Sequence, residues 1–169
     1  MHLAPAHFTP GTLVVLVGPS AAGKSTWCQQ FPTTWRVNLD TYRGMVCDDP
    51  SLQSGEAVIA RIQDLVLDAR LARNLTTLVD NTSLFPHARA RLLAQARLYR
   101  RPRVAILFDH VDLEERVRRN AARDRQVPLD ILRWQETLIP QPEQLLAEGF
   151  DQVFPAAETV GAAAGGRVG

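Results

Sequence analysis

The sequence has few cysteines and no pattern of metal ligands. Its 169 residues include two cysteines, Cys28 and Cys47, which are too few for a disulfide framework, so we expect reduced thiols. The histidines, at positions 2, 7, 87 and 110, lack ligand spacing and a companion cysteine pair, which argues against a zinc site. With 46% hydrophobic and 22% charged residues, the chain has the composition of one ordinary globular domain.

Long hydrophobic runs are also missing. No apolar stretch reaches the length of a membrane span, and residues 1–10 have neither the basic region nor the apolar core of a signal peptide. These absences predict a protein without membrane contact and a cytoplasmic location. No pattern points to an obligate protein partner.

Lysine is nearly absent. Arginine occurs 18 times and lysine once, as Lys24, which indicates a position that needs a compact charge on a flexible stem. The net charge of +1 is spread unevenly, because residues 89–133 carry twelve basic and six acidic side chains. This local excess predicts either a footprint for a polyanion or solvated arginine-rich helix faces.

The single lysine belongs to a phosphate-binding motif. An apolar stretch at 12–17 runs into GPSAAGKS, which matches the Walker A pattern GxxxxGK[ST]. Glycines let successive backbone N–H groups turn into one concavity at the start of a helix, where a polyphosphate fits. The motif predicts ATP and Mg²⁺ as cofactors, with Lys24 on the outer phosphates and the Ser25 hydroxyl on the metal. The expected nucleotide-binding residues are Gly18, Pro19, Ser20, Ala21, Ala22, Gly23, Lys24, Ser25 and Thr26.

Strand and helix patterns alternate along the rest of the chain. After the strand at 12–17, strands are predicted at 35–39, 76–79, 104–108 and 151–154, and helices at about 24–31, 53–73, 86–100, 112–124, 128–138 and 143–148. This alternation predicts an α/β fold of the P-loop NTPase class, in which a parallel sheet of about five strands lies between helices. We expect residues 1–155 to form this domain and the Ala/Gly-rich residues 156–169 to form a tail without structure.

Acidic residues follow two of the predicted strands. Ligands bind at the carboxyl ends of parallel strands, so Asp40 and Arg43 are expected beside the phosphate loop. There Asp40 could accept a proton from an attacking hydroxyl and Arg43 could hold an anionic part of the acceptor. The alternative role for Asp40 is a helix or turn cap. Asp80 ends another strand and is preferred over Asp109 as the acid that contacts Mg²⁺ through water.

Arginines cluster between residues 116 and 125. Arg119 and Arg123 are four residues apart and would share one face of the helix predicted at 112–124. Like charges at this spacing destabilise a helix unless an anion lies between them, which predicts that both arginines bind ATP phosphates. The alternative is a surface helix whose arginines pair with nearby acidic residues.

Together these motifs resemble one kinase family. GPSAAGKS, LDTYR, VDNT and RNAARDRQVP are similar to the 5′-hydroxyl polynucleotide kinase module of phage and bacterial end-healing enzymes, over about residues 12–140. The resemblance implies a helical lid, with Lys24, Asp40 and Arg123 as catalytic residues. Asp40 would be the general base for the acceptor 5′-OH, Arg43 would contact the acceptor's phosphate, and Arg119, Arg123 and Arg125 would contact the donor phosphates.

Two positions depart from the family pattern. Asn38 stands where the family often has serine, and Asp80-Asn81-Thr82-Ser83 stands in place of DATN. Both border the expected acceptor pocket, which makes Asn81 a candidate substrate contact and leaves the acceptor open.

The sequence therefore predicts an ATP-dependent kinase that acts on the 5′-hydroxyl end of RNA or DNA. The alternative is a P-loop kinase of a small-molecule hydroxyl, on a nucleoside, a sugar acid or an antibiotic. A third interpretation, from another class, is a nucleotide-gated binding module without turnover.

Overall fold

A five-stranded parallel sheet organises the computed structural model, which describes residues 3–49 and 56–159. The order of its strands is β2-β3-β1-β4-β5, and every neighbouring pair is parallel. The strands are β1 (Leu13–Val17), β2 (Arg36–Val37), β3 (Thr77–Val79), β4 (Arg103–Leu107) and β5 (Gln152–Pro155). The predicted α/β, P-loop NTPase class is thereby confirmed.

The central strand β1 is buried on both faces. Val14 and Leu16 pack in one apolar cluster with Trp27, whereas Leu13 and Val15 pack in the cluster on the other side of the sheet. A strand covered on both faces needs apolar residues at every position, which explains the unbroken run LVVLV.

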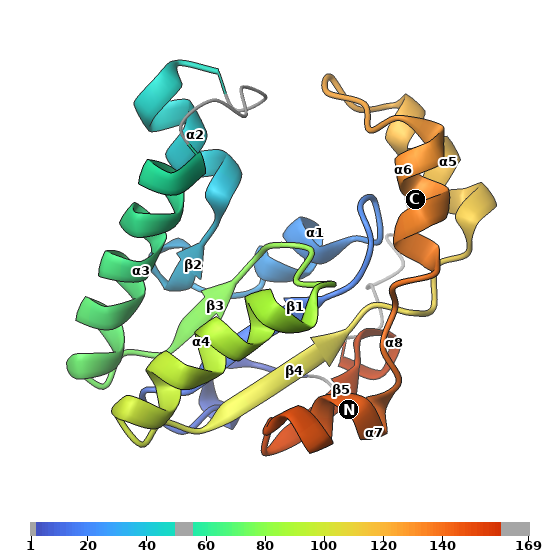
Figure 1. The fold of residues 1–169 in the computed structure, drawn as a ribbon. Helices are drawn as coiled ribbons and strands as arrows, with labels where there is room; N and C mark the ends of the chain where they lie inside the picture. Colours follow the sequence, from blue (N-terminus) through green and yellow to red (C-terminus); the bar gives the residue numbers. More distant parts are fainter. Residues whose placement is uncertain (1–2, 50–55, 160–169) are drawn as a thin grey trace, which may run out of the picture.

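Helices cover both faces of the sheet and extend beyond its edge. They are α1 (Lys24–Cys28), α2 (Leu39–Cys47), α3 (Glu56–Ala72), α4 (Pro86–Leu98), α5 (Leu113–Ala121), α6 (Leu129–Glu136), α7 (Pro142–Glu148) and α8 (Ala156–Thr159), with short 3-10 turns η1 (Pro5–His7) and η2 (Thr33–Trp35). Figure 1 shows α2 and α3 on one side and α5 and α6 on the other, with α1 between the two pairs. No helix in the described parts of the chain has the length and apolar character needed to cross a bilayer.

The strand predicted at 35–39 is shorter than expected. β2 ends at Val37, and Leu39 already begins α2, so Asp40 lies in the first turn of a helix and not at the end of a strand. The physical reason is Asn38, whose side-chain oxygen accepts a hydrogen bond from the Thr41 N–H at 3.0 Å. This N-cap starts the helix at the sheet edge.

The helix predicted at 112–124 is also too long. α5 ends at Ala121, because the Asn120 side chain both donates to the Val127 carbonyl (2.8 Å) and accepts from the Val127 N–H (2.9 Å). The chain between them closes into a loop, which we call the lid loop (residues 122–127). Arg123 lies in this loop, so Arg119 and Arg123 do not share a helix face.

The expectation of an unstructured tail from residue 156 is wrong at its start. Residues 156–159 form α8, and the Thr159 hydroxyl, 1% exposed, accepts a hydrogen bond from Trp27 Nε1 at 2.8 Å and donates to the Ala156 carbonyl. The folded domain therefore continues through Thr159. The predicted start of a helix at 53–55 and the predicted tail at 160–169 lie outside the described residues.

Candidate active site

The Walker A loop connects the centre of the sheet to α1. Gly18 lies so close to β4 that a Cβ on it would come 2.6 Å from Phe108 Cβ, so a side chain does not fit there. Gly23 has a φ of +96°, in the left-handed region, and is the N-cap of α1. Both glycines are therefore required by the conformation that turns the loop's N–H groups toward an anion.

Lys24 is buried within this loop. Its Nζ donates to the carbonyl oxygens of Gly18 (2.9 Å) and Pro19 (2.5 Å), and the residue is 8% exposed. Burial lowers the pKa of Lys24 from its ordinary 10.5 to about 8; the nearby Asp80 opposes this shift and the positive charge of Arg123 adds to it. An anion in the loop would restore the charged form.

The side-chain oxygens of Ser25 and Asp80 lie next to each other beside the loop. The Ser25 hydroxyl donates to Asp80 Oδ2 at 2.9 Å, and Arg36 donates to the same oxygen at 2.6 Å. Asp80 is 3% exposed at the end of β3, whereas Asp109 is exposed and lies outside the cavity described below. A hydroxyl next to a carboxylate is the oxygen chemistry that Mg²⁺ prefers, so these residues fit the metal implied by the motif.

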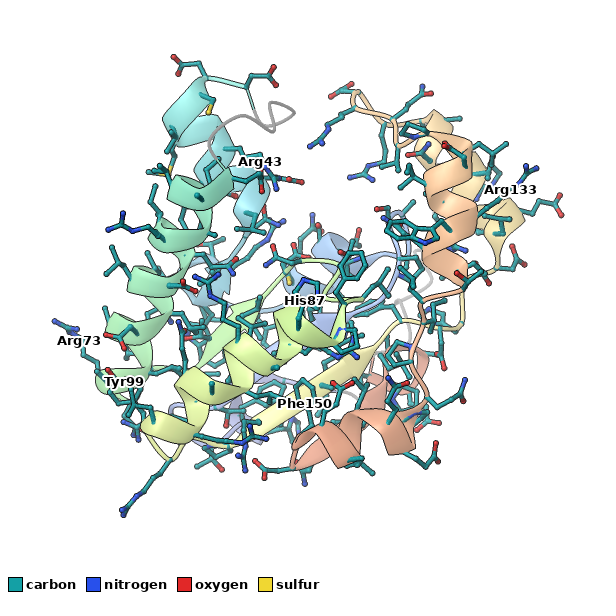
Figure 2. All side chains as sticks on the ribbon, in the orientation of Figure 1. Arg43, Arg73, His87, Tyr99, Arg133 and Phe150 are labelled. Carbon is teal, nitrogen blue, oxygen red and sulfur yellow. The ribbon has the colours of Figure 1, made fainter. Side chains whose placement is uncertain are left out.

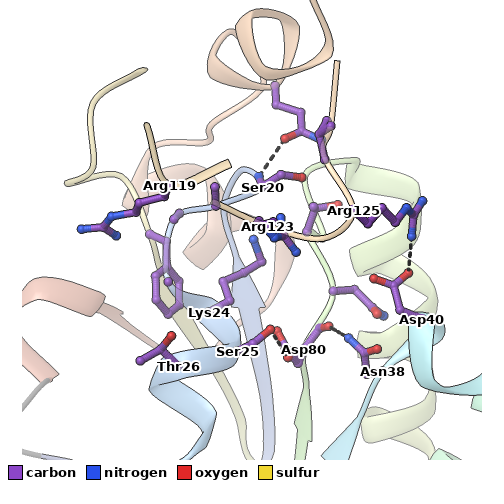
Figure 3. A pocket seen from close by; sticks show the side chains of 18 of the residues that line it. Ser20, Lys24, Ser25, Thr26, Asn38, Asp40, Asp80, Arg119, Arg123 and Arg125 are labelled. Atoms are coloured by element: carbon purple, nitrogen blue, oxygen red, sulfur yellow. Dashed lines mark hydrogen bonds and ion pairs between the residues drawn. The ribbon is translucent and has the colours of Figure 1, made fainter. Parts of the chain in front are cut away.

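Asp40 faces the phosphate loop from α2. Asn38 caps this helix, so the alternative role of Asp40 as a cap does not apply. Asp40 Oδ1 pairs with Arg43 on its own helix and lies 3.6 Å from Arg125 Nη1 in the lid loop (Figure 3). The Arg43 Nε and Nη2 groups also donate to the two carboxylate oxygens of Glu56 on α3.

Asn81 holds the start of α2 in place. Its side-chain oxygen accepts from the Leu39 N–H at 3.1 Å, and its Nδ2 donates to Gln63 Oε1 at 2.8 Å. The predicted substrate contact is thus engaged with the protein, although Asn81 also lines the cavity. Through Leu39 it fixes the position of the neighbouring Asp40.

The arginines of the lid differ in orientation. Arg123 lies beside the tip of Lys24, whereas Arg119 points away from it (Figure 3). Arg119 Nε donates to Glu115 Oε1 at 2.7 Å, and hydrogen bonds from Arg118 and Arg119 lower the pKa of Glu115 to about 2. Arg116 is fully buried and pairs with Glu136, so it joins α5 to α6.

One cavity of about 1200 Å³ unites these groups. Pockets for a single small ligand hold roughly 300–1,000 Å³, so this cavity has room for a donor and part of an acceptor. Its lining includes, from the predicted set, residues 20–26, Asp40, Arg43, Asp80, Asn81, Arg119, Arg123 and Arg125. Gly18 and Pro19 lie outside the lining, where their carbonyls accept from Lys24.

Sequence reasoning missed several residues of the cavity wall. Gln135 on α6 accepts from the Ser20 N–H at 2.7 Å, and His110 and Trp134 also line the cavity. None belongs to a motif with fixed spacing to the Walker A loop. For Gln135 the available signal is its place in the helix that follows the VP of the lid segment, seven residues after Pro128.

Comparison with solved structures gives neighbours with the same fold. A chain in the structure of the Pnkp1/Rnl/Hen1 RNA repair complex is 26% identical, with a TM-score of 0.67 over 86% of this chain and 47% of that chain. A second Pnkp1/Rnl/Hen1 complex gives 26% identity and a TM-score of 0.58 over 72% of this chain and 42% of that chain. The chain thus spans about half the length of these neighbours.

Two further neighbours show the fold alone. Kti12 from Chaetomium thermophilum is 16% identical, with a TM-score of 0.58 over 85% of this chain and 87% of that chain. A gluconokinase from Sinorhizobium meliloti 1021 is 19% identical, with a TM-score of 0.54 over 90% of this chain and 89% of that chain. No curated protein matches the sequence.

The fold and its neighbours support a nucleotide-dependent kinase, and the resemblance to the polynucleotide kinase module is confirmed. A P-loop kinase fold implies that the chain binds a nucleotide, ATP. The family model described as an AAA domain matches residues 13–142, and the chain therefore belongs to this P-loop family.

Proposed function

We propose that the chain is an ATP-dependent kinase that transfers the γ-phosphate to the 5′-hydroxyl end of a polynucleotide. The observation that carries the proposal is that Lys24 of the Walker A loop and Asp40 of α2 line the same cavity. The likeness to a chain of an RNA repair complex supports a nucleic-acid acceptor.

The donor phosphates would lie between the Walker A loop and the lid. Lys24 Nζ would exchange its two carbonyl partners for phosphate oxygens, and Arg123 would approach the same oxygens from the other side. Arg119 would first have to leave Glu115. Phosphoryl transfer depends mostly on positioning and on stabilising charge at the equatorial oxygens, which these cations supply.

Ser25 and Asp80 would hold Mg²⁺. When bound there, Mg²⁺ would supply positive charge that offsets the charge of the phosphates. Arg36 and the Ser25 hydroxyl keep the Asp80 carboxylate in position beside the loop.

Asp40 would act as the general base. Its carboxylate would accept the proton of the 5′-hydroxyl as that oxygen bonds to the γ-phosphorus and the bond to the ADP oxygen breaks. Because the transition state is loose, an ordinary carboxylate is basic enough for this role. Arg43 and Arg125 orient the Asp40 side chain, and either could turn to an acceptor phosphate.

A second candidate is a kinase of a small-molecule hydroxyl, and one observation favours it. Arg43 is proposed to bind the acceptor's phosphate, but its guanidinium already forms ion pairs with Asp40 and Glu56. An acceptor without a phosphate would leave this arrangement intact.

The test measures transfer of labelled γ-phosphate from ATP to 5′-hydroxyl RNA and DNA oligonucleotides. Free nucleosides and gluconate are assayed in parallel as small-molecule acceptors. We expect labelled oligonucleotides, and no label on a 5′-phosphorylated control. Label on nucleosides or gluconate alone would establish the second candidate. If no acceptor were labelled although ATP still bound, the protein would be a nucleotide-gated binding module without turnover.

Asp40→Asn tests the base. We expect kcat to fall by about 10²- to 10⁴-fold, the usual range for loss of general-base catalysis, while ATP binding persists. Asp109→Asn is the matched control, because Asp109 is an exposed aspartate outside the cavity lining. Equal rates for the two variants would exclude Asp40 as the base.

A further inference from the structure

Three aromatic rings gather beside the cavity. Phe85 stacks on His87 with ring centroids 5.4 Å apart and planes 21° apart, and it contacts Trp134 at 5.5 Å. We call this group the aromatic shelf (Phe85, His87, Trp134). Figure 2 shows His87 at the N-terminal end of α4, between the α2–α3 pair and the α5–α6 pair.

The shelf is exposed, and its Trp134 lines the cavity, whereas Phe85 and His87 lie outside the lining. Phe85 is 38% exposed, Trp134 is 48% exposed and His87 is exposed. Trp134 also lines the cavity, one helical turn beyond Ile131, which lines it too. Single exposed apolar side chains are ordinary, but mutually packed aromatic rings at the mouth of a binding cavity mark a contact surface.

The protein holds both halves of the shelf rigidly. Below Phe85, the fully buried Arg89 donates to the carbonyls of Ser83 (2.9 Å) and Leu84 (2.8 Å) and pairs with Glu148. This contact fixes the turn from which Phe85 projects. A surface ordered before binding loses little conformational entropy when a ligand arrives.

Trp134 is fixed in the same way on α6. The buried Arg116 donates to the Leu132 carbonyl and pairs with Glu136, on either side of Trp134. The Thr137 hydroxyl donates to the Trp134 carbonyl at 2.7 Å. Hydrogen bonds and ion pairs to the neighbouring backbone therefore hold the exposed rings in position.

The charge beside the shelf indicates its occupant. Arg43 and Arg125, either of which could turn to an acceptor phosphate, line the cavity that Trp134 borders. Aromatic rings next to a cationic groove are the recurring surface for single-stranded nucleic acid, because unpaired bases stack on the rings while the groove follows the phosphates.

We propose that the aromatic shelf stacks an unpaired base of the acceptor strand, downstream of the reacting 5′ end. The inference rests on the proposed function and deepens it, because it makes the acceptor single-stranded at that base. Stacking tolerates any base, so the shelf would favour strand length over sequence.

The kinetic test uses Trp134→Ala and Phe85→Ala with oligonucleotides that have one abasic position each. We expect each variant to raise the KM for an intact oligonucleotide about tenfold, in line with one lost base stack, while kcat and the KM for ATP stay unchanged. One abasic position should raise the KM of the wild type by a similar factor and leave that of Trp134→Ala unchanged. Trp134→Phe keeps a ring and should retain most of the wild-type affinity.

Leu98→Ala is the matched control. Leu98 is 72% exposed at the opposite end of α4 from the shelf, so its removal should leave every KM unchanged. A general loss of folding would instead lower kcat for all acceptors.

A binding measurement separates the shelf from the kinase proposal. Oligonucleotide should quench tryptophan fluorescence in the wild type and much less in Trp134→Phe, which keeps Trp27 and Trp35. Quenching without transfer to any acceptor would overturn the kinase proposal and retain the shelf as a nucleic-acid surface. If phosphate is transferred and both alanine variants keep the wild-type KM for the oligonucleotide, the shelf proposal alone is overturned. If the oligonucleotide causes no quenching and receives no phosphate, both proposals are overturned.

Discussion

Lys24 is buried in a loop that its own side chain helps to shape. Because burial lowers its pKa from 10.5 to about 8, the free protein loses the Lys24 charge as the pH rises above about 8. Bound phosphates favour the charged form and raise the pKa again. Nucleotide binding and proton binding are therefore coupled at this residue.

We predict that kcat/KM for ATP falls above about pH 8, whereas kcat at saturating ATP keeps its value to higher pH. Binding of ATP at pH 8 to 9 should take up protons, and calorimetry in buffers of different ionisation enthalpy measures that uptake. A pH-independent affinity for ATP across this range would contradict the pKa shift.

The same residue allows a chemical check. As the single lysine, Lys24 should be the ε-amine that an acylating reagent modifies, and its lowered pKa leaves it partly neutral and reactive near pH 8. ATP should protect it, and mass spectrometry of the modified peptide measures this protection. Modification that is equally fast with and without ATP would place the nucleotide away from Lys24.

Motif residues were predictable where short-range spacing fixes the backbone. The Walker A spacing determines the turn, so the positions of Lys24 and Ser25 followed from sequence. The Asp80 partners did not, because Arg36 reaches Asp80 only once β2 pairs with β3. The contacts of Asp40 with Arg125 likewise depend on how two distant helix pairs face each other.

At the scale of elements, the lid loop depends on one side chain. Asn120 is 6% exposed and makes both hydrogen bonds that close the loop onto Val127. Each such bond contributes about 0.5–1.5 kcal/mol. The loop presents Arg123 and Arg125, so its closure positions two of the proposed phosphate contacts.

Asn120→Ala should therefore lower the melting temperature modestly and kcat by a much larger factor, because the lid arginines lose their position. Asn120→Asp keeps the acceptor for the Val127 N–H and should give an intermediate rate. Arg118→Ala, on the exposed face of α5, is the control. Kinase assays and thermal denaturation measure both effects, and equal losses in Asn120→Ala and Arg118→Ala would argue against a positioning role.

Helix ends were the least predictable elements. The apolar and charged pattern at 112–124 suits a continuous helix, and only the pairing of Asn120 with Val127 ends it early. Asn38 similarly starts α2 within the stretch 35–39 that was predicted to be a strand. In both cases one amide side chain competes with the regular backbone pattern.

At the scale of the whole molecule, α8 ties the end of the described chain to α1. Thr159→Val would leave the Trp27 N–H buried without its acceptor, a loss of about 1–3 kcal/mol. We expect a fall in melting temperature of roughly 2–10 °C, measured by thermal denaturation. Thr34→Val, at an exposed threonine of η2, should change it little. If Thr159→Val melted at the same temperature as the wild type, α8 would not be part of the folded core.

Salt should weaken the reaction through local charge. With a net charge of +1 the whole protein attracts a polyanion weakly, so attraction arises from the cavity arginines. For an oligonucleotide with two phosphates neutralised, log(kcat/KM) should fall with log salt with a slope of about −1.4. A nucleoside 3′-phosphate should give about half that slope, and a flat dependence for oligonucleotides would favour the small-molecule kinase.

The central position of β1 and the parallel sheet followed from sequence, because an unbroken apolar strand must be covered on both faces. The alanine-rich segment after residue 155 gave no such signal. Within it, Thr159 is buried against Trp27, more than a hundred positions earlier in the chain.

The contact of Asp40 with Arg125 joins the two helix pairs across the cavity mouth. An exposed ion pair contributes at most about 1 kcal/mol, so the incoming hydroxyl can displace it at thermal energies. In the proposed reaction, the acceptor would compete with Arg125 for the Asp40 carboxylate. Entry of an acceptor would therefore loosen this link between the α2–α3 pair and the lid loop.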